Sequence, residues 1–304
     1  MSDRGYVHAL DNISLDVASG ESIGIVGETG SGKSTLGKAV LEILPPRTKA
    51  EGQVLFLGKE LSHLDNEKIR HIRGEKIALI FQDPMTRLNP LMTIEDHFVE
   101  AITAHQKVSR REAVARAKAA LTSMRVSESR IRNYPHEFSG GMRQRIMIAL
   151  ALVLNPSLLV ADEPTTSLDV IVEAQILEIL EDLKRAYKMS LLLITHNLGI
   201  VAEVCDRVAV FYAGKIVEIG SVDDIFNRPI HPYTRLLLQS IIHLDTKELH
   251  SIEGVPPDLV SPPSGCRFHP RCPYAQAVCR EKNPPLEEFR QGQRAACLFG
   301  KDFL

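Results

Sequence analysis

The chain has 304 residues, 44% of them hydrophobic, which is enough for one large α/β domain with an appendage. Its 36 Lys and Arg against 38 Asp and Glu give a formal net charge of -2, so no net positive field attracts nucleic acid or anionic lipid, which weakens nucleic-acid binding without excluding it. The longest apolar run, residues 146–154, is far shorter than the roughly 20 residues that cross a bilayer, and the N-terminus has no apolar signal core. We therefore expect a globular cytosolic protein that reaches a membrane only through a partner.

Short apolar runs alternate with longer amphipathic segments, which predicts an α/β fold with a mixed first sheet. We expect strands at residues 12–17, 22–26, 77–81, 158–162 and 190–195, and hairpins at 54–59 and 208–219. We expect helices from residue 33 to before residue 45, over 66–72, within 92–133, after 139 and over 171–187. Apolar residues spaced at three and four within 111–124 support an inserted helical subdomain over about 92–150.

The composition changes near residue 222. The remaining tail contains a disproportionate share of the prolines and four of the five cysteines. We therefore divide the chain into a main domain, residues 1–221, and a small C-terminal module, residues 222–304.

The segment GETGSGKS follows an apolar strand and opens a helix, which is the context of a phosphate-binding loop. Its glycines let successive backbone N–H groups turn toward phosphates, and the helix N-terminus adds its positive end. Lys33 is expected to reach the β- and γ-phosphates, and Ser34 to ligate Mg²⁺. The expected nucleotide contacts in this loop are Gly27, Glu28, Thr29, Gly30, Ser31, Gly32, Lys33, Ser34 and Thr35.

Several polar residues end apolar strands. Asp162 and Glu163 are adjacent carboxylates that would be costly there without a function, so we expect Asp162 to hold Mg²⁺ through water and Glu163 to orient the attacking water. Gln82 ends a further strand, where a glutamine before Asp-Pro, taken alone, also suits a turn cap. His196 follows another apolar strand and, taken singly, a histidine there is more often an ordinary strand-end residue than a catalytic group.

A Ser-Gly-Gly turn at residues 139–141 opens a helix shortly before the acidic strand, and with the other motifs it resembles the ATP-binding cassette, or ABC, ATPases. The resemblance implies a RecA-like core with an antiparallel β subdomain and the inserted helical subdomain. It implies ATP hydrolysis by a dimer in which this turn closes over ATP held by a partner subunit, through Ser139, Gly140, Gly141 and Met142. It also makes Gln82 the Q-loop glutamine that approaches Mg²⁺ and the attacking water, His196 the switch histidine at the γ-phosphate, and residues 167–169 the D-loop.

Motifs outside the general ATPase machinery narrow the resemblance. HPYT at residues 231–234 and SGCRFHPRCPYA at 264–275 look like oligopeptide and dipeptide importer ATPase subunits, and Met142 looks like the D-type subunit rather than the F-type. This implies ATP-driven peptide import at the cytoplasmic face of the cell membrane. The implied partners are an F-type ATPase as heterodimer partner, two transmembrane permease subunits and an extracytoplasmic peptide-binding protein, with no nucleic acid.

Three alternatives remain open. A related nickel or glutathione importer would use the same kind of ATPase subunit, which does not touch the substrate. ABC ATPases that act on DNA or ribosomes usually have two cassettes or long coiled-coil insertions, and 304 residues contain neither. An inactive regulatory subunit is expected to lose Lys33, Glu163 or His196, and all three are present.

Two features depart from the family pattern. His196 is followed by Asn197 where the family usually has Asp, and we expect this to alter a local cap rather than the chemistry. Relatives carry an extra strand before the position of His8, so we expect a truncated or late-started chain. Tyr6 is then the aromatic candidate for stacking on adenine, with an ordinary loop residue as the alternative.

The four late cysteines are separated by five, six and seventeen residues, so they lack the paired C-x-x-C knuckles of structural zinc. Disulfides are not expected in a cytosolic chain. The thiols could simply pack the tail, since free cysteine is often buried, or they could hold an iron–sulfur cluster. The resemblance to peptide-importer ATPases with this tail supports a structural [4Fe–4S] cluster, with zinc as the alternative. Its ligands would be Cys266, Cys272, Cys279 and Cys297.

Overall fold

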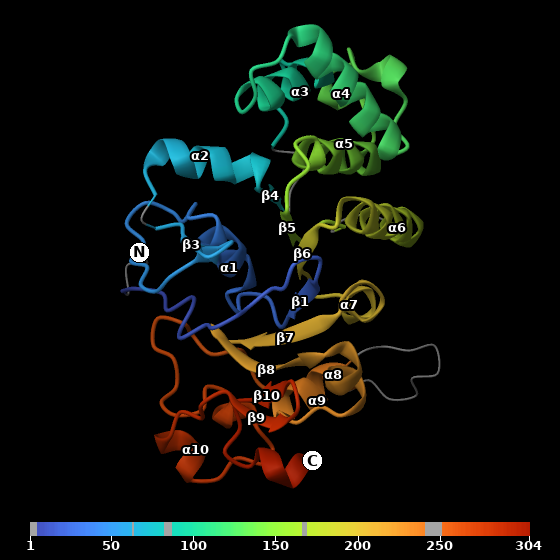
Figure 1. Cartoon of the computed structure of the whole chain (residues 1–304). Coiled ribbons are helices and arrows are strands. Elements are labelled where there is room, and N and C mark those ends of the chain that lie inside the picture. The colour runs from blue at the N-terminus through green and yellow to red at the C-terminus, as the bar shows by residue number, and fades with distance from the viewer. Residues whose placement is uncertain (1–4, 63, 82–86, 166–168, 241–250) are drawn as a thin grey trace. The chain divides into compact units, whose positions relative to one another are not determined.

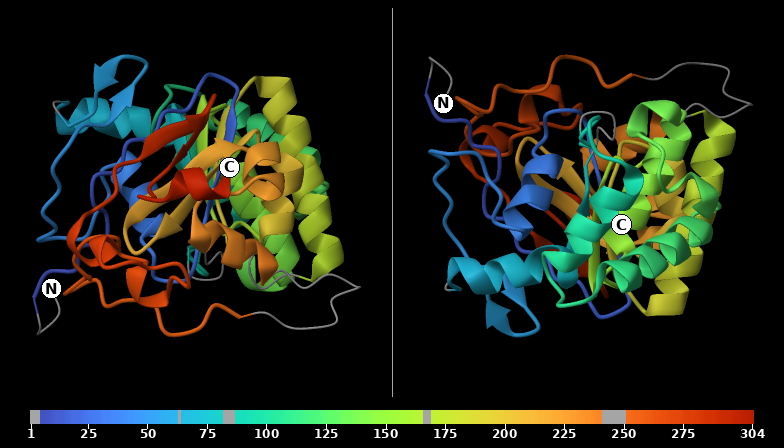
Figure 2. Two further views of the ribbon diagram at one scale, coloured as in Figure 1. Left: turned by 90° about the horizontal axis from the view of Figure 1, so that it is seen from below. Right: turned by 90° about the horizontal axis from the view of Figure 1, so that it is seen from above.

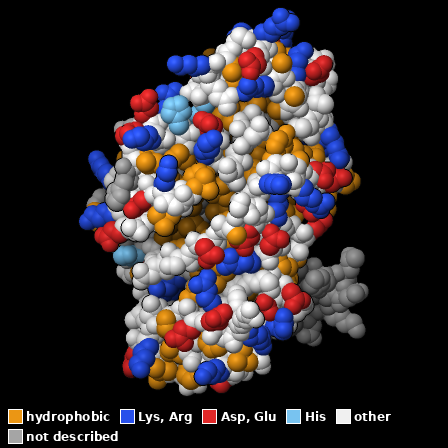
Figure 3. Space-filling model, viewed as in Figure 1, with side chains coloured by type: hydrophobic (Ala, Val, Ile, Leu, Met, Phe, Trp, Pro, Cys, Tyr) orange, Lys and Arg blue, Asp and Glu red, His pale blue; other side chains and the backbone are white. Residues whose placement is uncertain are grey.

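The computed structural model describes residues 5–62, 64–81, 87–165, 169–240 and 251–304. The chain forms two compact units: the first is Met1–Val17, Ser22–Lys49 and Leu193–Leu304, and the second is Ala18–Glu21 and Ala50–Leu192. On the face drawn in Figure 3, basic and acidic side chains are interspersed. Within the described ranges, every helix is too short or too polar to cross a membrane.

The first unit is built on a mixed sheet with the strand order β1-β7-β8-β10-β9 (Figure 1). β1 and β7 are parallel, with Ile23 opposite Arg207, and the remaining neighbours are antiparallel. β1 is buried along its whole length, which explains why it consists of consecutive apolar residues. The strands of this unit are β1 (Ser22–Val26), β7 (Arg207–Tyr212), β8 (Lys215–Ser221), β9 (Glu287–Arg290) and β10 (Gln293–Ala295). Its helices are α1 (Lys33–Val40), α7 (Leu198–Val204), α8 (Val222–Asn227), α9 (Pro232–Gln239), α10 (Val278–Glu281), η3 (His269–Arg271) and η4 (Gly300–Phe303).

The second unit combines a parallel strand pair with a group of helices. β4 and β5 pair with Ile77 opposite Leu158, and β2 and β3 form a separate small hairpin. α3 packs on α4, and both pack on α5; these green helices stay together in every view (Figures 1 and 2). The strands are β2 (Leu55–Phe56), β3 (Lys59–Glu60), β4 (Ile77–Ile80), β5 (Leu158–Asp162) and β6 (Ser190–Ile194), whose last residues belong to the first unit. The helices are α2 (Asn66–Glu75), α3 (Ile94–Thr103), α4 (Arg110–Ser123), α5 (Gly140–Leu152), α6 (Val170–Tyr187), η1 (Glu128–Arg130) and η2 (Pro135–Glu137).

The expected α/β architecture with a mixed sheet is confirmed, but one expected strand is wrong. Residues 12–17 alternate between exposed and half-buried positions, yet they form no strand in the described structure. Alternation reports which side of an extended segment is covered, whereas a strand also needs a neighbour that pairs with its backbone. The helix expected at 66–72 extends to Glu75 across a kink, where Arg73 leaves the helical conformation and Gly74 has φ 84°.

A buried carboxylate in β8 holds the beginning and the end of the C-terminal tail together. Glu218 is fully buried and accepts hydrogen bonds from the backbone N–H groups of Ile230 (2.8 Å) and His231 (2.9 Å) and from Nε2 of Gln293 (2.9 Å). Burial raises the pKa of Glu218, while these donors favour its ionised form. Because Gln293 lies in β10, this side chain fixes both the turn before α9 and the hairpin that extends the sheet.

We expect Glu218→Ala to lower the free energy of unfolding by about 3 kcal/mol, because it leaves buried N–H donors without an acceptor. Urea unfolding followed by circular dichroism would measure the change. Glu218→Gln keeps the shape and one acceptor oxygen, so its loss should be smaller. A Glu218→Ala protein as stable as the wild type would show that this carboxylate does not hold the tail.

Candidate nucleotide-binding site

The phosphate loop between β1 and α1 depends on two glycines. Gly27 has φ 146°, and a Cβ at this position would lie 2.1 Å from the carbonyl oxygen of Phe211. Gly32 has φ 106°, and a Cβ there would lie 2.2 Å from the carbonyl oxygen of Ala9. A side chain at either position would displace backbone, so these glycines let the loop pass between β7 and the N-terminal segment.

Lys33 lies at the centre of this loop. Its side chain is only 6% exposed, and Nζ donates to the carbonyl oxygens of Gly27 (2.7 Å) and Glu28 (2.9 Å). Gly32 is the N-cap of α1 and provides no side-chain cap, and the first turn of the helix contains no acidic residue. The positive end of the helix and the ammonium group therefore favour an anion at the same place.

The other loop residues surround this position. Thr29 and Gly30 are exposed, whereas Ser34 and Thr35 are half-buried. The hydroxyl of Ser31 is buried and has no hydrogen-bond partner among the described residues. A buried hydroxyl without a partner is costly, so this one is suited to donate to a ligand oxygen.

The first unit also brings His196 to the end of β1. The N–H of Thr195 donates to the carbonyl oxygen of Ile25 at 3.2 Å, so the chain leaving β6 lies beside the strand that enters the phosphate loop. His196 itself is exposed. Asn197 caps α7 by accepting from the N–H groups of Gly199 (3.1 Å) and Ile200 (3.4 Å). Ligands of open α/β sheets bind at such carboxyl ends of parallel strands.

Tyr6 lies in the N-terminal segment that continues to Ala9, whose carbonyl oxygen faces Gly32. Its side chain is 43% exposed, and Nζ of Lys49 lies 5.0 Å from the ring centroid. The ring is thus held by a cation–π contact and remains partly open to solvent.

In the second unit, the acidic pair lies in a turn that neighbouring helices support. Asp162 ends β5 and is 6% exposed, and Glu163 follows with φ 48°. The side-chain amide of Gln144 in α5 donates to the carbonyl oxygen of Pro164, and Thr165 donates to Glu173 of α6 at 2.6 Å. A non-glycine residue with positive φ persists only where its surroundings fix it, and such residues cluster at functional sites.

The Ser-Gly-Gly turn lies at the N-terminus of α5 and is partly exposed. Ser139 and Gly140 are exposed, the Ser139 side chain makes no capping hydrogen bond, and the first turn contains no acidic residue. The turn rests on Arg130, whose guanidinium lies 4.2 Å from the ring centroid of Phe138 and 3.6 Å from the sulfur of Met142. A supported, exposed helix N-terminus of this kind suits an anion supplied from outside the unit.

The predicted site residues are divided between the units. The first contains Tyr6, the phosphate loop and His196, and the second contains Asp162, Glu163 and residues 139–142. Gln82 and the D-loop residues 167–168 lie outside the described residues. The remaining D-loop residue, Asp169, caps α6 by accepting from the N–H of Val172 at 2.9 Å.

All four cysteines of the tail line one pocket. Its other lining residues are mostly aromatic or apolar, and include Phe268, Tyr274 and Phe303. Burial raises the pKa of Cys266 and Cys297 to about 11 and also raises the pKa of Cys272. The four thiols therefore share a partly buried, largely apolar environment, and their soft donor atoms suit zinc or an iron–sulfur cluster.

Sequence reasoning missed two contacts to the phosphate loop. The Tyr233 hydroxyl accepts a hydrogen bond from the N–H of Glu28 at 3.0 Å, and Arg271 pairs with the Glu28 carboxylate at 2.7 and 3.0 Å. These residues belong to the HPYT and SGCRFHPRCPYA segments, in which neither Tyr233 nor Arg271 was predicted to have a role of its own. Arg271 is 243 positions from Glu28, and no local pattern indicates a pairing over that distance.

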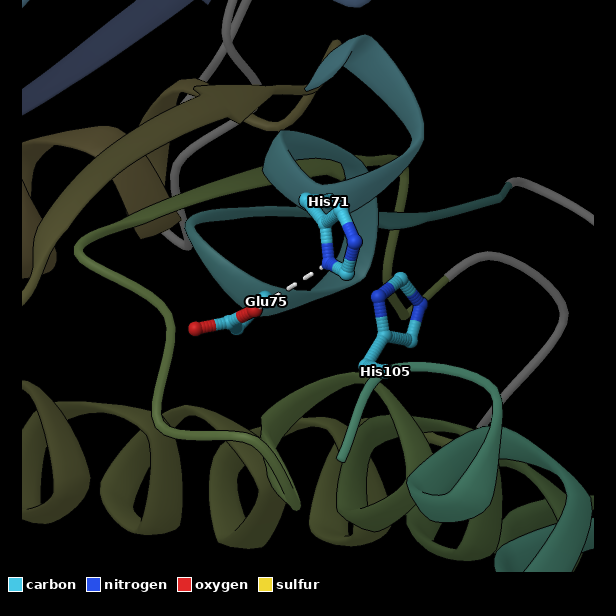
Figure 4. A group of neighbouring side chains, drawn as sticks. All are labelled: His71, Glu75 and His105. Carbon is cyan, nitrogen blue, oxygen red and sulfur yellow. Dashed lines mark ion pairs between the residues drawn. The ribbon is translucent and has the colours of Figure 1, made fainter. Parts of the chain in front are cut away.

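A further group of potential metal ligands was also missed. His71, Glu75 and His105 have ligand atoms within 4.8 Å of one another, and Figure 4 shows one Glu75 oxygen directed at the His71 ring. The other oxygen pairs with Lys76 at 3.1 Å. Because Lys76 already neutralises the only carboxylate of the group, we interpret the three residues as part of a surface ion-pair network rather than as a metal site.

Two family models match the chain. The model described as ABC transporter matches residues 10–166, and the model described as oligopeptide/dipeptide transporter, C-terminal region, matches residues 217–279. The chain is 48% identical to a probable peptide ABC transporter ATP-binding protein of Sinorhizobium fredii, covering 97% of this chain and 90% of the relative. It is 48% identical to the dipeptide transport ATP-binding protein DppD of Bacillus subtilis, and the match covers 92% of this chain and 85% of the relative. It is 44% identical to the oligopeptide transport ATP-binding protein OppD of Salmonella typhimurium, covering 97% and 89%.

Solved structures agree with the sequence matches. A dimeric ATP-binding cassette in a post-hydrolysis state with ADP and Pi is 29% identical and has a TM-score of 0.63, covering 70% of this chain and 90% of that one. The cbiO1 protein of Clostridium perfringens, part of an ABC transporter complex, is 28% identical with a TM-score of 0.63, covering 73% and 86%.

Proposed function

Because the chain belongs to the ABC transporter family, we propose that it is the ATP-hydrolysing subunit that powers the import of dipeptides or oligopeptides across the cytoplasmic membrane. One observation carries the proposal: a phosphate loop built around a buried lysine occurs on the same chain as a region that matches oligopeptide and dipeptide transporters. Relatives named for peptide transport align with 92 to 97% of the chain. Lys33, Glu163 and His196 are all present, which favours an active subunit over a regulatory one.

The geometry supports a role for each site residue. Lys33 would exchange its two carbonyl acceptors for oxygens of the β- and γ-phosphates, while the N–H groups of residues 27–35 surround them. Glu163 would orient the attacking water, and His196 would contact the γ-phosphate. Tyr6 would stack on adenine through its open ring face. ADP and phosphate would then be the products.

Oxygen donors that fit Mg²⁺ are available at both motifs. Ser34 at the start of α1 and the buried Asp162 at the end of β5 are hard ligands, and Gln82 would add a third contact. Bound Mg²⁺ would neutralise the charge that develops on the phosphates.

The exposed N-terminus of α5 supports a dimer. Ser139 and Gly140 are exposed and the Ser139 side chain makes no capping hydrogen bond, so we infer that residues 139–142 bind ATP held by a second, F-type ATPase subunit. The surface around Gln82 and the helical subdomain would receive the two transmembrane permease subunits at the cytoplasmic face. An extracytoplasmic peptide-binding protein would deliver the substrate.

We retain the division into an ATPase domain at 1–221, with the helical subdomain at about 92–150, and a C-terminal module at 222–304.

We further propose that the cysteine pocket holds a structural [4Fe–4S] cluster. The four thiols line one pocket together, and cysteine thiolates are the ligands that iron–sulfur clusters use. Zinc, which also binds thiolates, is the alternative occupant. Such a cluster would cross-link Cys266, Cys272, Cys279 and Cys297 in a module with little regular structure.

Reconstitution of the complete importer would test the transport function. The chain is co-purified with its partner subunits, placed in proteoliposomes, and supplied with binding protein, ATP and a labelled peptide. We expect peptide accumulation that requires ATP and is lost with Lys33→Ala, because that change removes a charge-assisted contact to phosphate. ATPase activity of the isolated chain should be slow and should rise in the complex.

Other outcomes would identify the alternatives. Uptake of Ni²⁺ or glutathione without peptide uptake would show that the importer carries one of these substrates instead of peptides. An ATPase activity that stays proportional to concentration at high dilution, and is insensitive to permease, would reject the transporter assignment.

A further inference from the structure

Arg271 connects the cysteine-bearing module to the phosphate loop through all three of its side-chain nitrogens. Nη1 and Nη2 donate to the two carboxylate oxygens of Glu28 at 2.7 and 3.0 Å. Nε and Nη2 also donate to the carbonyl oxygens of Glu253 (2.9 Å) and Ile252 (3.1 Å), and Nη1 lies 3.4 Å from the Tyr212 hydroxyl. The side chain is only 5% exposed, so the guanidinium is held in one orientation. A two-point Arg–carboxylate pair of this kind is both strong and geometrically specific.

Glu28 carries this connection to the lysine of the loop. Its N–H donates to the Tyr233 hydroxyl, and its carbonyl oxygen accepts from Lys33 Nζ at 2.9 Å. A carboxylate in a loop that binds a polyanion would repel the phosphates unless a cation neutralised it. Arg271 supplies that cation from the opposite end of the chain.

The position of Arg271 depends on the cysteine pocket. Arg271 ends η3, its N–H donates to the carbonyl oxygen of Phe268 at 3.0 Å, and Cys272 follows directly. The Phe268 ring lines the pocket and packs against the rings of Tyr212 and Tyr233, with centroids 5.0 and 5.3 Å apart. The residues that fix the loop are thus the immediate neighbours of the thiols.

We propose that Arg271 is a positioning residue that neutralises Glu28 and couples the state of the cysteine pocket to the affinity of the phosphate loop for nucleotide. This inference rests on the proposed ATPase function and, in its second half, on the proposed cluster. A module with a filled pocket holds η3, and with it Arg271, against Glu28. When the pocket is empty, η3 is less constrained, the pair loosens, and the charge of Glu28 opposes nucleotide binding.

Affinity for MgADP, measured with a fluorescent nucleotide on the full-length chain purified anaerobically, tests the charge-neutralising role. Arg271→Ala should weaken binding about 10- to 100-fold, and Arg271→Lys, which keeps the charge without the two-point geometry, should have an intermediate effect. The double variant Glu28→Gln/Arg271→Ala should bind within about threefold of Glu28→Gln, because no uncompensated carboxylate remains. Arg280→Ala, an exposed arginine in the same module, is the control and should bind as the wild type does.

Two results would overturn the proposal that Arg271 neutralises Glu28. Equal affinity of Arg271→Ala and the wild type would show that the pair is irrelevant to binding. A double variant as weak as Arg271→Ala would show that the arginine acts through folding rather than through the charge of Glu28.

The coupling is tested by emptying the pocket. Cys272→Ser, or removal of the bound metal from the wild type, should weaken MgADP binding, and the same treatment should change little in the Glu28→Gln/Arg271→Ala background. In the assembled importer, the KM for ATP should rise more than kcat falls. Unchanged affinity of metal-depleted wild-type protein would reject the coupling. Wild-type protein that never contains metal would reject the cluster itself, and the variants at positions 28 and 271 would then decide the charge-neutralising role alone.

Discussion

Glu163→Gln should almost abolish ATP hydrolysis while leaving ATP bound. Glutamine keeps the shape of the side chain in the supported turn after β5 but cannot polarise a water molecule as a carboxylate does. We expect turnover in the assembled complex to fall by about 10²- to 10⁴-fold, the usual contribution of a positioned general base. Because binding contacts from the phosphate loop and from residues 139–142 remain, ATP should hold the two ATPase subunits in a closed dimer. Phosphate release and size-exclusion chromatography with ATP would measure both effects.

A matched control separates the role of Glu163 from a general effect of losing a carboxylate. Glu178→Gln removes an exposed carboxylate that pairs with Arg125 at 3.1 Å on the same unit. It should leave turnover close to that of the wild type, because exposed ion pairs contribute little. Full ATPase activity of Glu163→Gln in the assembled complex would reject the catalytic role.

Cys279→Ser should remove the proposed iron–sulfur cluster from the C-terminal module. Cys279 is buried, and its carbonyl oxygen accepts from the N–H of Cys266 at 2.8 Å, so it lies at the junction of two segments of the pocket. A hydroxyl replaces a soft thiolate ligand, and a cluster bound by three cysteines is readily lost. Wild-type protein purified anaerobically should be brown, with broad visible absorption and about four irons per chain. The variant should be nearly colourless and more easily cleaved by protease within the tail.

Cys205→Ser is the control for this experiment, since Cys205 is buried in the first unit and does not line the pocket. It should keep the full iron content. Colourless wild-type protein with one zinc per chain would show that the cysteine pocket binds zinc instead of an iron–sulfur cluster. Metal-free protein with four reactive thiols would leave only the packing role of these cysteines.

The sequence by itself determined the parts of the site that are local in the chain. The phosphate loop needs a buried strand, closely spaced glycines and a helix start within a few residues. These parts are consecutive in the sequence and are therefore also neighbours in space. Asp162, Glu163 and the exposed turn before α5 have the same property, because strand ends and helix starts position their own side chains. The alternating segment at 12–17 shows the limit of such patterns, because pairing with a neighbour cannot be deduced from one segment alone.

Only the tertiary structure decided which distant segments support the loop. The tail appeared as an appended module because its composition changes, but β10 pairs with β8 and continues the sheet. Glu218 accepts from the backbone before α9 and from Gln293, and Arg271 reaches Glu28, through contacts that depend on how the chain folds back on itself. Charge and hydrogen bonding act over a few ångströms in space, whatever the separation in sequence. The candidate nucleotide contacts are therefore visible in the sequence, whereas the distant residues that hold the loop in place are not.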